Sequence, residues 1–267
     1  MSSKDQVKDL FTKTVDDWAR FYNDPKPSTL GAQNLVSRMR FALEMLESKA
    51  PPGAKVLDVG CGAGQLVGEL MRRGYEAWGV DVSEAMVGYA REHYQIDRFR
   101  AADIENLPFP DGTFDAVMCL GVMEYLNQDE AALREMRRVL KPGGRAVITT
   151  PSVTCPFYYM DMAYQQVRPV ARPLVRWVRH GLLGRQVPPA SVLPNVVHRR
   201  YYRRRWVRLM RSLGLELEDW VCHAWGWYSL EWLFNQGAFC RASDRFARMR
   251  WVSGLASDQL ACVRAVK

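Results

Sequence analysis

Hydrophobic positions in the first 50 residues repeat at helical spacing. Apolar side chains recur every three or four residues from Phe11 to Tyr22 and again from Leu35 to Leu46. Between these stretches, Asn23–Pro27 contains two prolines, which interrupt a helix. The pattern predicts two helices in an N-terminal region, residues 1–50, that caps the remainder of the chain.

From residue 51 the pattern alternates between short apolar runs and amphipathic segments. The apolar runs predict strands at 55–59, 75–80, 99–102, 114–120 and 145–150. Helical spacing predicts helices at 66–73, 83–94 and 129–140, the second capped by Ser83. Strands that alternate with helices indicate an α/β fold, a doubly wound parallel sheet spanning 51–151.

The alternation is interrupted twice after residue 151. Residues 152–198 contain six prolines and are rich in arginine, and 221–258 are rich in tryptophan and phenylalanine. A helix at 202–213 and strands at 215–220 and 260–266 are predicted around the second stretch. We therefore expect 152–198 to form a basic lid insertion and 199–267 to complete the core around an aromatic insertion.

Composition places the chain among soluble globular proteins. It has 267 residues, of which 48% are hydrophobic and 25% charged. No apolar run reaches the roughly 18 residues of a membrane span, and Met1–Asp9 does not resemble a secretory signal. The six cysteines form no Cys-x-x-Cys pair, which argues against a metal site and a disulfide framework. These features predict a cytoplasmic protein with reduced thiols.

The formal charge of +8 is concentrated in one part of the chain. Residues 152–211 contain twelve arginines and a single acid, Asp161. Within this stretch, 165–183 has the spacing of a basic amphipathic helix. Three interpretations stay open: a packed helix with a solvated face, peripheral contact with an anionic membrane, and recognition of an anionic substrate. Nucleic acid is not favoured as a partner, because the basic residues form no separate RNA-binding module.

A glycine-rich loop, Gly60–Gly64, follows the first predicted strand. Glycine allows tight turns and close approach to a ligand, and the next helix presents free N–H groups. The spacing is G-x-G-x-G, with Asp58 two residues before it. Gln65 departs from the dinucleotide fingerprint, and the lack of a following Gly-Lys-Ser/Thr excludes a phosphate-binding P-loop.

Carboxylates stand at the ends of the next two strands. Asp81 ends the second strand, where it can accept hydrogen bonds from both hydroxyls of a ribose. Asp103 ends the third strand, where it can accept an adenine amino hydrogen while Ile104 covers the ring. A glycine loop followed by two such acids predicts a site for an adenosine-containing cofactor.

Five motifs in order resemble the class I S-adenosylmethionine methyltransferases, in particular the ubiquinone and menaquinone biosynthesis group. The motifs lie at 58–64, 79–83, 102–104, 107–115 and 138–144. The resemblance implies S-adenosylmethionine as cofactor and a Rossmann-like, seven-stranded sheet whose last strand is antiparallel. It also implies that the N-terminal helices close over the cofactor, with Trp18 and Tyr22 as contacts. The combined candidates for cofactor contact are Tyr22, Asp58, Gly60, Cys61, Gly62, Gly64, Asp81, Val82, Met86, Asp103, Ile104 and Leu120.

Catalytic residues are harder to identify from sequence. In methyl transfer the cofactor supplies the reactivity, and the protein supplies alignment and a dry pocket. Relatives often carry Glu-His after the fourth strand, whereas this chain has Glu124-Tyr125. His198, His223 and Tyr125 are the candidates for a base or substrate contact, and a packing role stays open for each.

These observations predict an enzyme that methylates an oxygen or nitrogen of a small acceptor. The aromatic insertion favours an aromatic, quinone-like or lipid-like acceptor, and the arginines allow an anionic one. Two alternatives stay open, because a fold does not determine its chemistry. One is methylation of RNA or protein, and the other is a non-methylating reaction of a cofactor-binding protein, such as cyclisation.

Overall fold

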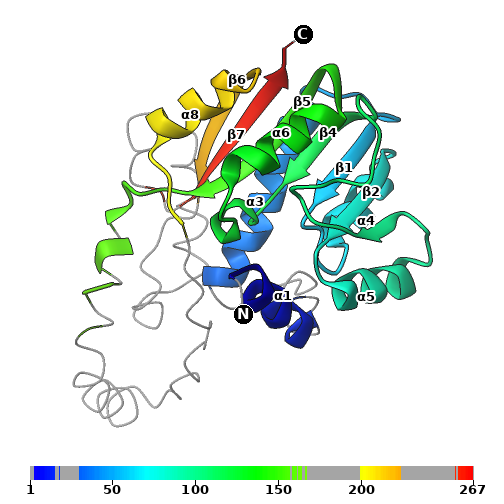
Figure 1. The fold of residues 1–267 in the computed structure, drawn as a ribbon, viewed down its shortest axis with the longest axis horizontal. Helices are drawn as coiled ribbons and strands as arrows, with labels where there is room; N and C mark the ends of the chain where they lie inside the picture. The colour runs from blue at the N-terminus through cyan, green and yellow to red at the C-terminus, as the bar shows by residue number, and fades with distance from the viewer. Residues whose placement is uncertain are drawn as a thin grey trace.

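The computed structural model describes residues 3–15, 18, 30–156, 158–160, 162–163, 166, 199–223, 256 and 258–266. These residues form a seven-stranded sheet with helices on both faces (Figure 1). The elements are α1 Ser3–Lys13, α3 Leu30–Glu47, β1 Lys55–Val59, α4 Gln65–Arg72, β2 Glu76–Asp81, α5 Glu84–Tyr94, β3 Phe99–Ala101, β4 Phe114–Cys119, the 3₁₀ turn η1 Met123–Tyr125, α6 Asp129–Val139, β5 Leu140–Pro151, α8 Arg203–Ser212, β6 Leu215–His223 and β7 Asp258–Ala265.

The sheet has the strand order β3-β2-β1-β4-β5-β7-β6. Strands β1 to β5 pair in parallel, and β7 runs antiparallel to both β5 and β6. The predicted fold class, a doubly wound sheet with an antiparallel last strand, is confirmed. Because β1 to β4 are parallel, their carboxyl ends meet at one edge, where ligands bind in sheets of this kind.

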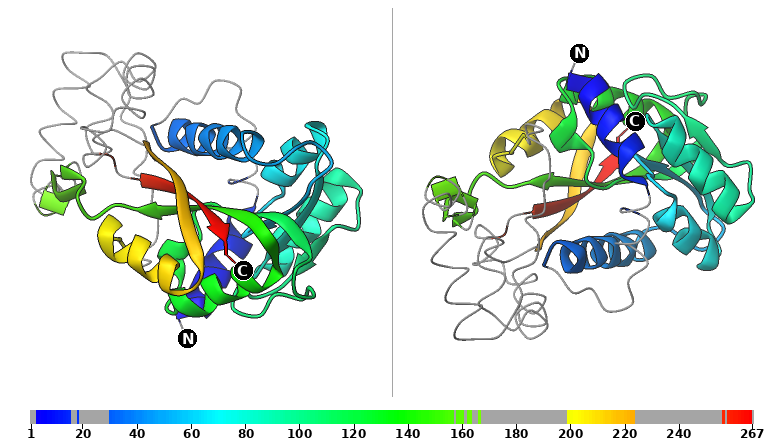
Figure 2. Two further views of the ribbon diagram at one scale, coloured as in Figure 1. Left: turned by 90° about the horizontal axis from the view of Figure 1, so that it is seen from above. Right: turned by 90° about the horizontal axis from the view of Figure 1, so that it is seen from below.

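Alternate residues of the strands face two separate cores. On one face, Val56 and Ala116 pack among the apolar side chains of α3, α4 and α5. On the other face, Leu57 and Val117 pack among those of α6 and α8. The views along the sheet show these helices as two layers (Figure 2). The strands are buried on both sides, which explains why their sequences read as short continuous apolar runs.

The predicted boundaries agree with the structure to within two residues except at two strands. Strand β6 continues three residues past the predicted end at Trp220, because Val221, Cys222 and His223 pair with β7. Strand β5 begins at Leu140 rather than Arg145, with a pairing irregularity opposite β4. Ser83 caps α5 as predicted, accepting a hydrogen bond from the N–H of Met86. Both differences depend on pairing with distant strands, which local periodicity does not contain.

Helix α1 lies across the carboxyl edge of the sheet. Phe11, Val15 and Trp18 pack against Met86 and Ala63, which belong to α5 and the glycine loop. The N-terminal segment thus contacts the glycine loop and α5, and its role as a cap over the cofactor stays a prediction. The break at 23–27, most of the lid at 152–198, the basic segment 165–183 and the aromatic residues 224–255 lie largely or wholly outside the described residues.

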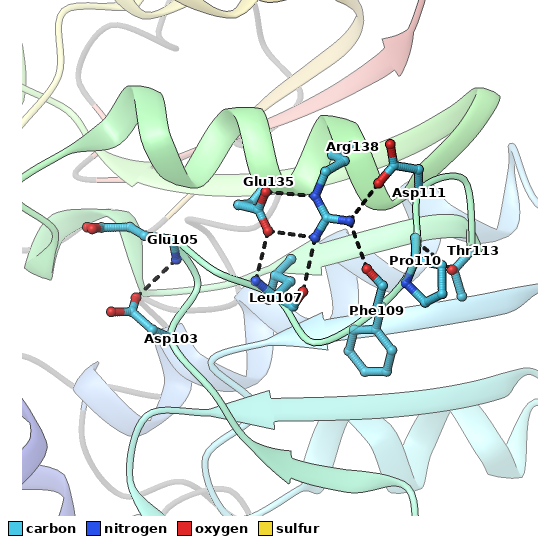
Figure 3. A network of polar contacts seen from close by, with 9 residues as sticks. All are labelled: Asp103, Glu105, Leu107, Phe109, Pro110, Asp111, Thr113, Glu135 and Arg138. Atoms are coloured by element: carbon cyan, nitrogen blue, oxygen red, sulfur yellow. Dashed lines mark hydrogen bonds and ion pairs between the residues drawn. The ribbon is translucent and has the colours of Figure 1, made fainter.

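Arg138 on α6 holds the loop that follows β3 (Figure 3). Its guanidinium donates to the carbonyls of Phe109 at 2.8 Å and Leu107 at 3.0 Å. It also pairs with Glu135 at 2.7 Å, and Glu135 accepts the N–H of Leu107 at 2.8 Å. Because Asp103 begins this loop, the network also positions one wall of the carboxyl edge.

Candidate cofactor-binding site

The glycine loop needs glycine for two different physical reasons. The φ angles of Gly60, Gly62 and Gly64 are 76°, 52° and 89°, a region that other residues rarely adopt. At Gly60 an added Cβ would lie 2.2 Å from Cγ2 of Val122, so the loop and the segment after β4 touch. Helix α4 begins directly after Gly64 and has no side-chain cap at its N-terminus. The loop thus places an uncapped helix end beside the carboxyl edge.

Asp81 faces the glycine loop from the end of β2. Its Oδ2 accepts the N–H of Gly62 at 2.9 Å, and its Oδ1 accepts the N–H of Ser83 at 2.9 Å. These bonds fix the carboxylate between two backbone segments. Burial raises the pKa of Asp81, while the same N–H groups act in the opposite direction.

Asp58 and Arg38 bring an acidic and a basic side chain to the neighbouring part of the site. The Asp58 side chain is buried, and burial together with Asp81 raises the pKa of Asp58 to about 8, against the influence of Arg38. The guanidinium of Arg38 lies against Gly121, where a Cβ would collide with it. Arg38 comes from α3, and the sequence analysis missed it. The sequence feature that could have identified Arg38 is its place on the apolar face of this helix, three residues after Leu35 and four before Ala42, where a cation is unexpected.

A cavity runs along this edge, and its wall includes ten of the twelve predicted cofactor contacts. They are Asp58, Gly60, Cys61, Gly62, Asp81, Val82, Met86, Asp103, Ile104 and Leu120. Gly64 is not part of the wall: a Cβ there would lie 2.9 Å from both Phe99 and Tyr94, so this glycine is needed for packing. Tyr22 lies outside the described residues. The wall also contains residues that the sequence analysis did not propose as contacts, among them Phe11, Gln65, Arg38 and Glu124.

The three candidates for catalysis differ in position. Tyr125 lines the cavity, and the ring of Phe11 stands edge-on to its ring at 5.5 Å. His223 is buried at the end of β6, beside Phe41 of α3, and does not belong to the cavity wall. Burial lowers the pKa of His223 to about 3, with a smaller contribution from Arg38, so the imidazole is neutral. His198 lies outside the described residues.

The cavity is therefore suited to a ligand that contains several polar groups in a row. Acidic side chains at the ends of the neighbouring strands β3, β2 and β1 lie in its wall together with the glycine loop. The wall also contains the cation Arg38 and apolar and aromatic side chains. Hydroxyl, amino and ammonium groups match the carboxylates, and a carboxylate matches the guanidinium.

Comparison with known proteins identifies the family. The family described as "Methyltransferase domain" matches residues 57–148. The chain is 34% identical to a ubiquinone biosynthesis O-methyltransferase of Xanthomonas axonopodis pv. citri, over 79% of this chain and 80% of that protein. The chain belongs to the class I S-adenosylmethionine-dependent methyltransferases. The predicted enzyme class and cofactor are confirmed.

Other matches of this methyltransferase are shorter or more distant. It is 38% identical to a malonyl-[acyl-carrier protein] O-methyltransferase of Erwinia pyrifoliae, over 40% of this chain and 41% of that enzyme. The chain spans only about half the length of several curated relatives, with coverage of 48% and 55% in two of them. The fold matches magnesium protoporphyrin IX methyltransferase of Synechocystis, with a TM-score of 0.63 and 17% identity, over 98% of this chain and 99% of that one. Within the described part of the methyltransferase, no helix is long and apolar enough to cross a membrane.

Proposed function

We propose that this methyltransferase acts on an oxygen or nitrogen of a small aromatic, quinone-like or lipid-like acceptor in biosynthesis. The observation that carries the proposal is the lining of the cavity, which contains the aromatic side chains of Phe11, Trp18 and Tyr125 in addition to the predicted cofactor contacts. Aromatic walls favour flat or apolar acceptors. The similarity to the ubiquinone biosynthesis O-methyltransferase, which spans 80% of that protein, supports the same acceptor class.

We assign residues of the cavity wall to the groups of S-adenosylmethionine by their chemistry. Asp103 and Ile104 are assigned to the adenine, and Asp81 to the ribose hydroxyls. Asp58 is assigned to the ammonium group of the methionine part, and Arg38 to its carboxylate. A bound ammonium group would also restore the charged form of Asp58, whose pKa burial raises to about 8. The loop of Gly60 and Gly62 lets the backbone approach the cofactor without side chains in between.

In this proposal the protein contributes alignment and exclusion of water. The cofactor supplies an electrophilic methyl group on a sulfonium, and in-line transfer requires the acceptor to be held on the opposite side. Phe11 and Trp18 of the N-terminal segment cover the cavity beside the glycine loop, where they would exclude water from the reacting groups. Contact of 165–183 with a membrane or with an anionic acceptor stays a separate prediction. Flotation with anionic liposomes tests the membrane contact.

The assignment of Asp81 is tested by calorimetric titration of S-adenosylmethionine into Asp81→Asn. The variant keeps the size of the side chain but loses the charge, so affinity should fall about 5-fold to 100-fold, as expected for charge-assisted hydrogen bonds. Asp97→Asn is the matched control, because Asp97 is exposed and outside the cavity wall. Equal affinity of Asp81→Asn and the control would contradict the site.

The acceptor class is tested with methyl-labelled cofactor and a cell extract separated into apolar small molecules, polar small molecules, protein and RNA. Label in the apolar small-molecule fraction supports the proposal. Label that appears only in RNA or only in protein would overturn it. Demethylated cofactor that accumulates without any labelled product would instead indicate a reaction other than methyl transfer.

A further inference from the structure

Glu124 is a buried acid in the cavity wall, and none of the cofactor contacts assigned above involves it. It belongs to the turn η1, and its side chain is 8% exposed. Its Oε2 atom is shielded from solvent and has no hydrogen-bond partner among the described residues. A buried carboxylate oxygen without a partner is costly, and such atoms in native proteins call for a functional explanation.

The turn that carries Glu124 is held by contacts from a distant segment. The N–H of Arg199 donates to the carbonyl of Glu124 at 3.0 Å. The hydroxyl of Tyr201 donates to the carbonyl of Met123 at 2.9 Å, and the Arg199 guanidinium donates to the carbonyl of Leu126 at 2.9 Å. The backbone on both sides of Glu124 is therefore held in place, so the turn presents this residue from a fixed position in the cavity wall.

The strand order places Glu124 at the end of the cavity opposite the adenine contacts. In the order β3-β2-β1-β4, Asp103 follows β3, Asp81 ends β2, the glycine loop follows β1, and Glu124 follows β4. With the adenine at Asp103 and the ribose at Asp81, the methionine part and its methyl group point towards β4. Glu124 and Tyr125 thus belong to the part of the wall where the acceptor must enter.

Burial, partly opposed by nearby cations, brings the pKa of the Glu124 carboxyl group close to neutral pH. Burial raises the pKa of Glu124 to about 7, with a further contribution from Asp258 on β7, against the influence of Arg38 on α3 and of Arg200. Among the described residues, Cys119 on β4 and Tyr201 also interact electrostatically with Glu124. A carboxyl group that titrates near neutral pH suits proton transfer at that pH.

We propose that Glu124 receives the proton of the acceptor during methyl transfer and thereby selects acceptors that still carry a proton over carboxylates. This inference rests on the proposed function. In the step, the acceptor bond to hydrogen breaks and the proton moves to Glu124, while the acceptor's electron pair forms the bond to the methyl carbon. The carbon–sulfur bond breaks with its electrons on sulfur, and the protonated Glu124 later returns the proton to water. A carboxylate acceptor has no proton to give, and its charge is repelled by ionised Glu124.

The first test needs no acceptor, because an ionised Glu124 near the sulfonium favours the charged cofactor over its neutral demethylated product. Calorimetry at pH 8 measures the affinities of wild type and Glu124→Gln for S-adenosylmethionine and S-adenosylhomocysteine. The preference for S-adenosylmethionine should fall about tenfold in Glu124→Gln, the size expected for a partly screened pair of unit charges. At pH 5.5, where Glu124 is protonated, the two proteins should show the same preference.

Two further variants complete the calorimetric test. Glu124→Asp keeps the charge and should keep most of the preference, which separates charge from a packing role. Glu130→Gln is the control, since Glu130 is exposed on α6 and pairs only with Arg134 among the described residues. An unchanged preference in Glu124→Gln would overturn the role of Glu124. If the wild type bound neither S-adenosylmethionine nor S-adenosylhomocysteine, the proposed cofactor site itself would be contradicted.

The second test compares two probes of similar size, 4-methylcatechol and 4-methylbenzoate, with methyl-labelled cofactor. The rate of methyl transfer to the catechol at pH 7 should be about 100-fold or more lower in Glu124→Gln than in the wild type, which is the usual contribution of a general base. It should recover partly at pH 10, where the catechol ionises by itself. Preferential methylation of 4-methylbenzoate, recognised because its ester releases methanol in alkali, would overturn the proposal.

Discussion

Substitution of Gly60 tests how closely the glycine loop and the turn after β4 are packed. Alanine at this position meets two problems in the structure. Its backbone would have to keep a φ of 76°, and its Cβ would lie 2.2 Å from Cγ2 of Val122, far inside the normal contact distance. Gly62 offers a matched control, because it has a φ of 52° but no atom within 4 Å of the added Cβ.

The two positions separate backbone strain from steric overlap. A left-handed conformation costs a residue with a Cβ about 1–2 kcal/mol, which applies to both Gly60→Ala and Gly62→Ala. The overlap with Val122 adds about 1–3 kcal/mol at Gly60 alone, the usual cost of overpacking. We therefore expect Gly60→Ala to lose about 2–5 kcal/mol of unfolding free energy, and Gly62→Ala about 1–2 kcal/mol.

The assay is urea unfolding followed by far-UV circular dichroism, with Val122→Ala as the third variant. Removing the γ methyl groups of Val122 eliminates the collision, so the double variant Gly60→Ala/Val122→Ala should be more stable than the two single losses predict. The coupling should match the overlap, about 1–3 kcal/mol. Because the same collision separates two walls of the cavity, calorimetry should also show weaker cofactor binding in Gly60→Ala than in the double variant.

Two results would refute this reasoning. If Gly60→Ala and Gly62→Ala lose equal stability, the contact with Val122 has no energetic consequence. If the losses in the double variant simply add, the turn after β4 moves away at little cost. In that case the rigid placement of Glu124, which lies on the same turn, would lose its support as well.

Two further predictions concern charged residues outside the cavity. Arg138→Met should lower the unfolding free energy, measured in urea, by about 2–4 kcal/mol, because two loop carbonyls and the carboxylate of Glu135 lose their donor. Arg134→Met is the control: the ion pair of Arg134 is exposed, so its loss should change the unfolding free energy by less than about 0.5 kcal/mol. Hydrogen bonds from Arg72 lower the pKa of Glu69 from 4.5 to about 2, with Arg73 contributing, so this stabilisation is complete above about pH 4.5 and is lost as the pH falls towards 2. Wild type should therefore lose more unfolding free energy than Glu69→Gln between pH 5 and pH 3, and parallel losses would contradict the assignment.

Local sequence was sufficient for most helices and strands of this fold. The apolar run Lys55–Val59 coincides with β1, and the capping signal at Ser83 coincides with the start of α5. Such signals succeed because side-chain periodicity and capping act over a few residues. The antiparallel last strand was not contained in any local pattern; it came from the resemblance to the methyltransferase family, and the pairing of β7 with β5 and β6 confirms it.

For the site, the chain by itself determined which chemical groups stand at the strand ends. The glycine spacing of Gly60–Gly64, followed by an acid such as Asp81, predicts a cofactor-binding site, because short motifs of this kind specify their own backbone geometry. Only the tertiary structure placed Arg38 from α3 against Gly121, and Val122 over Gly60. It also showed that Glu124 is buried in the same cavity wall. The two contacts join residues 83 and 62 positions apart in the chain, so they depend on how the sheet brings its carboxyl ends together rather than on any local pattern.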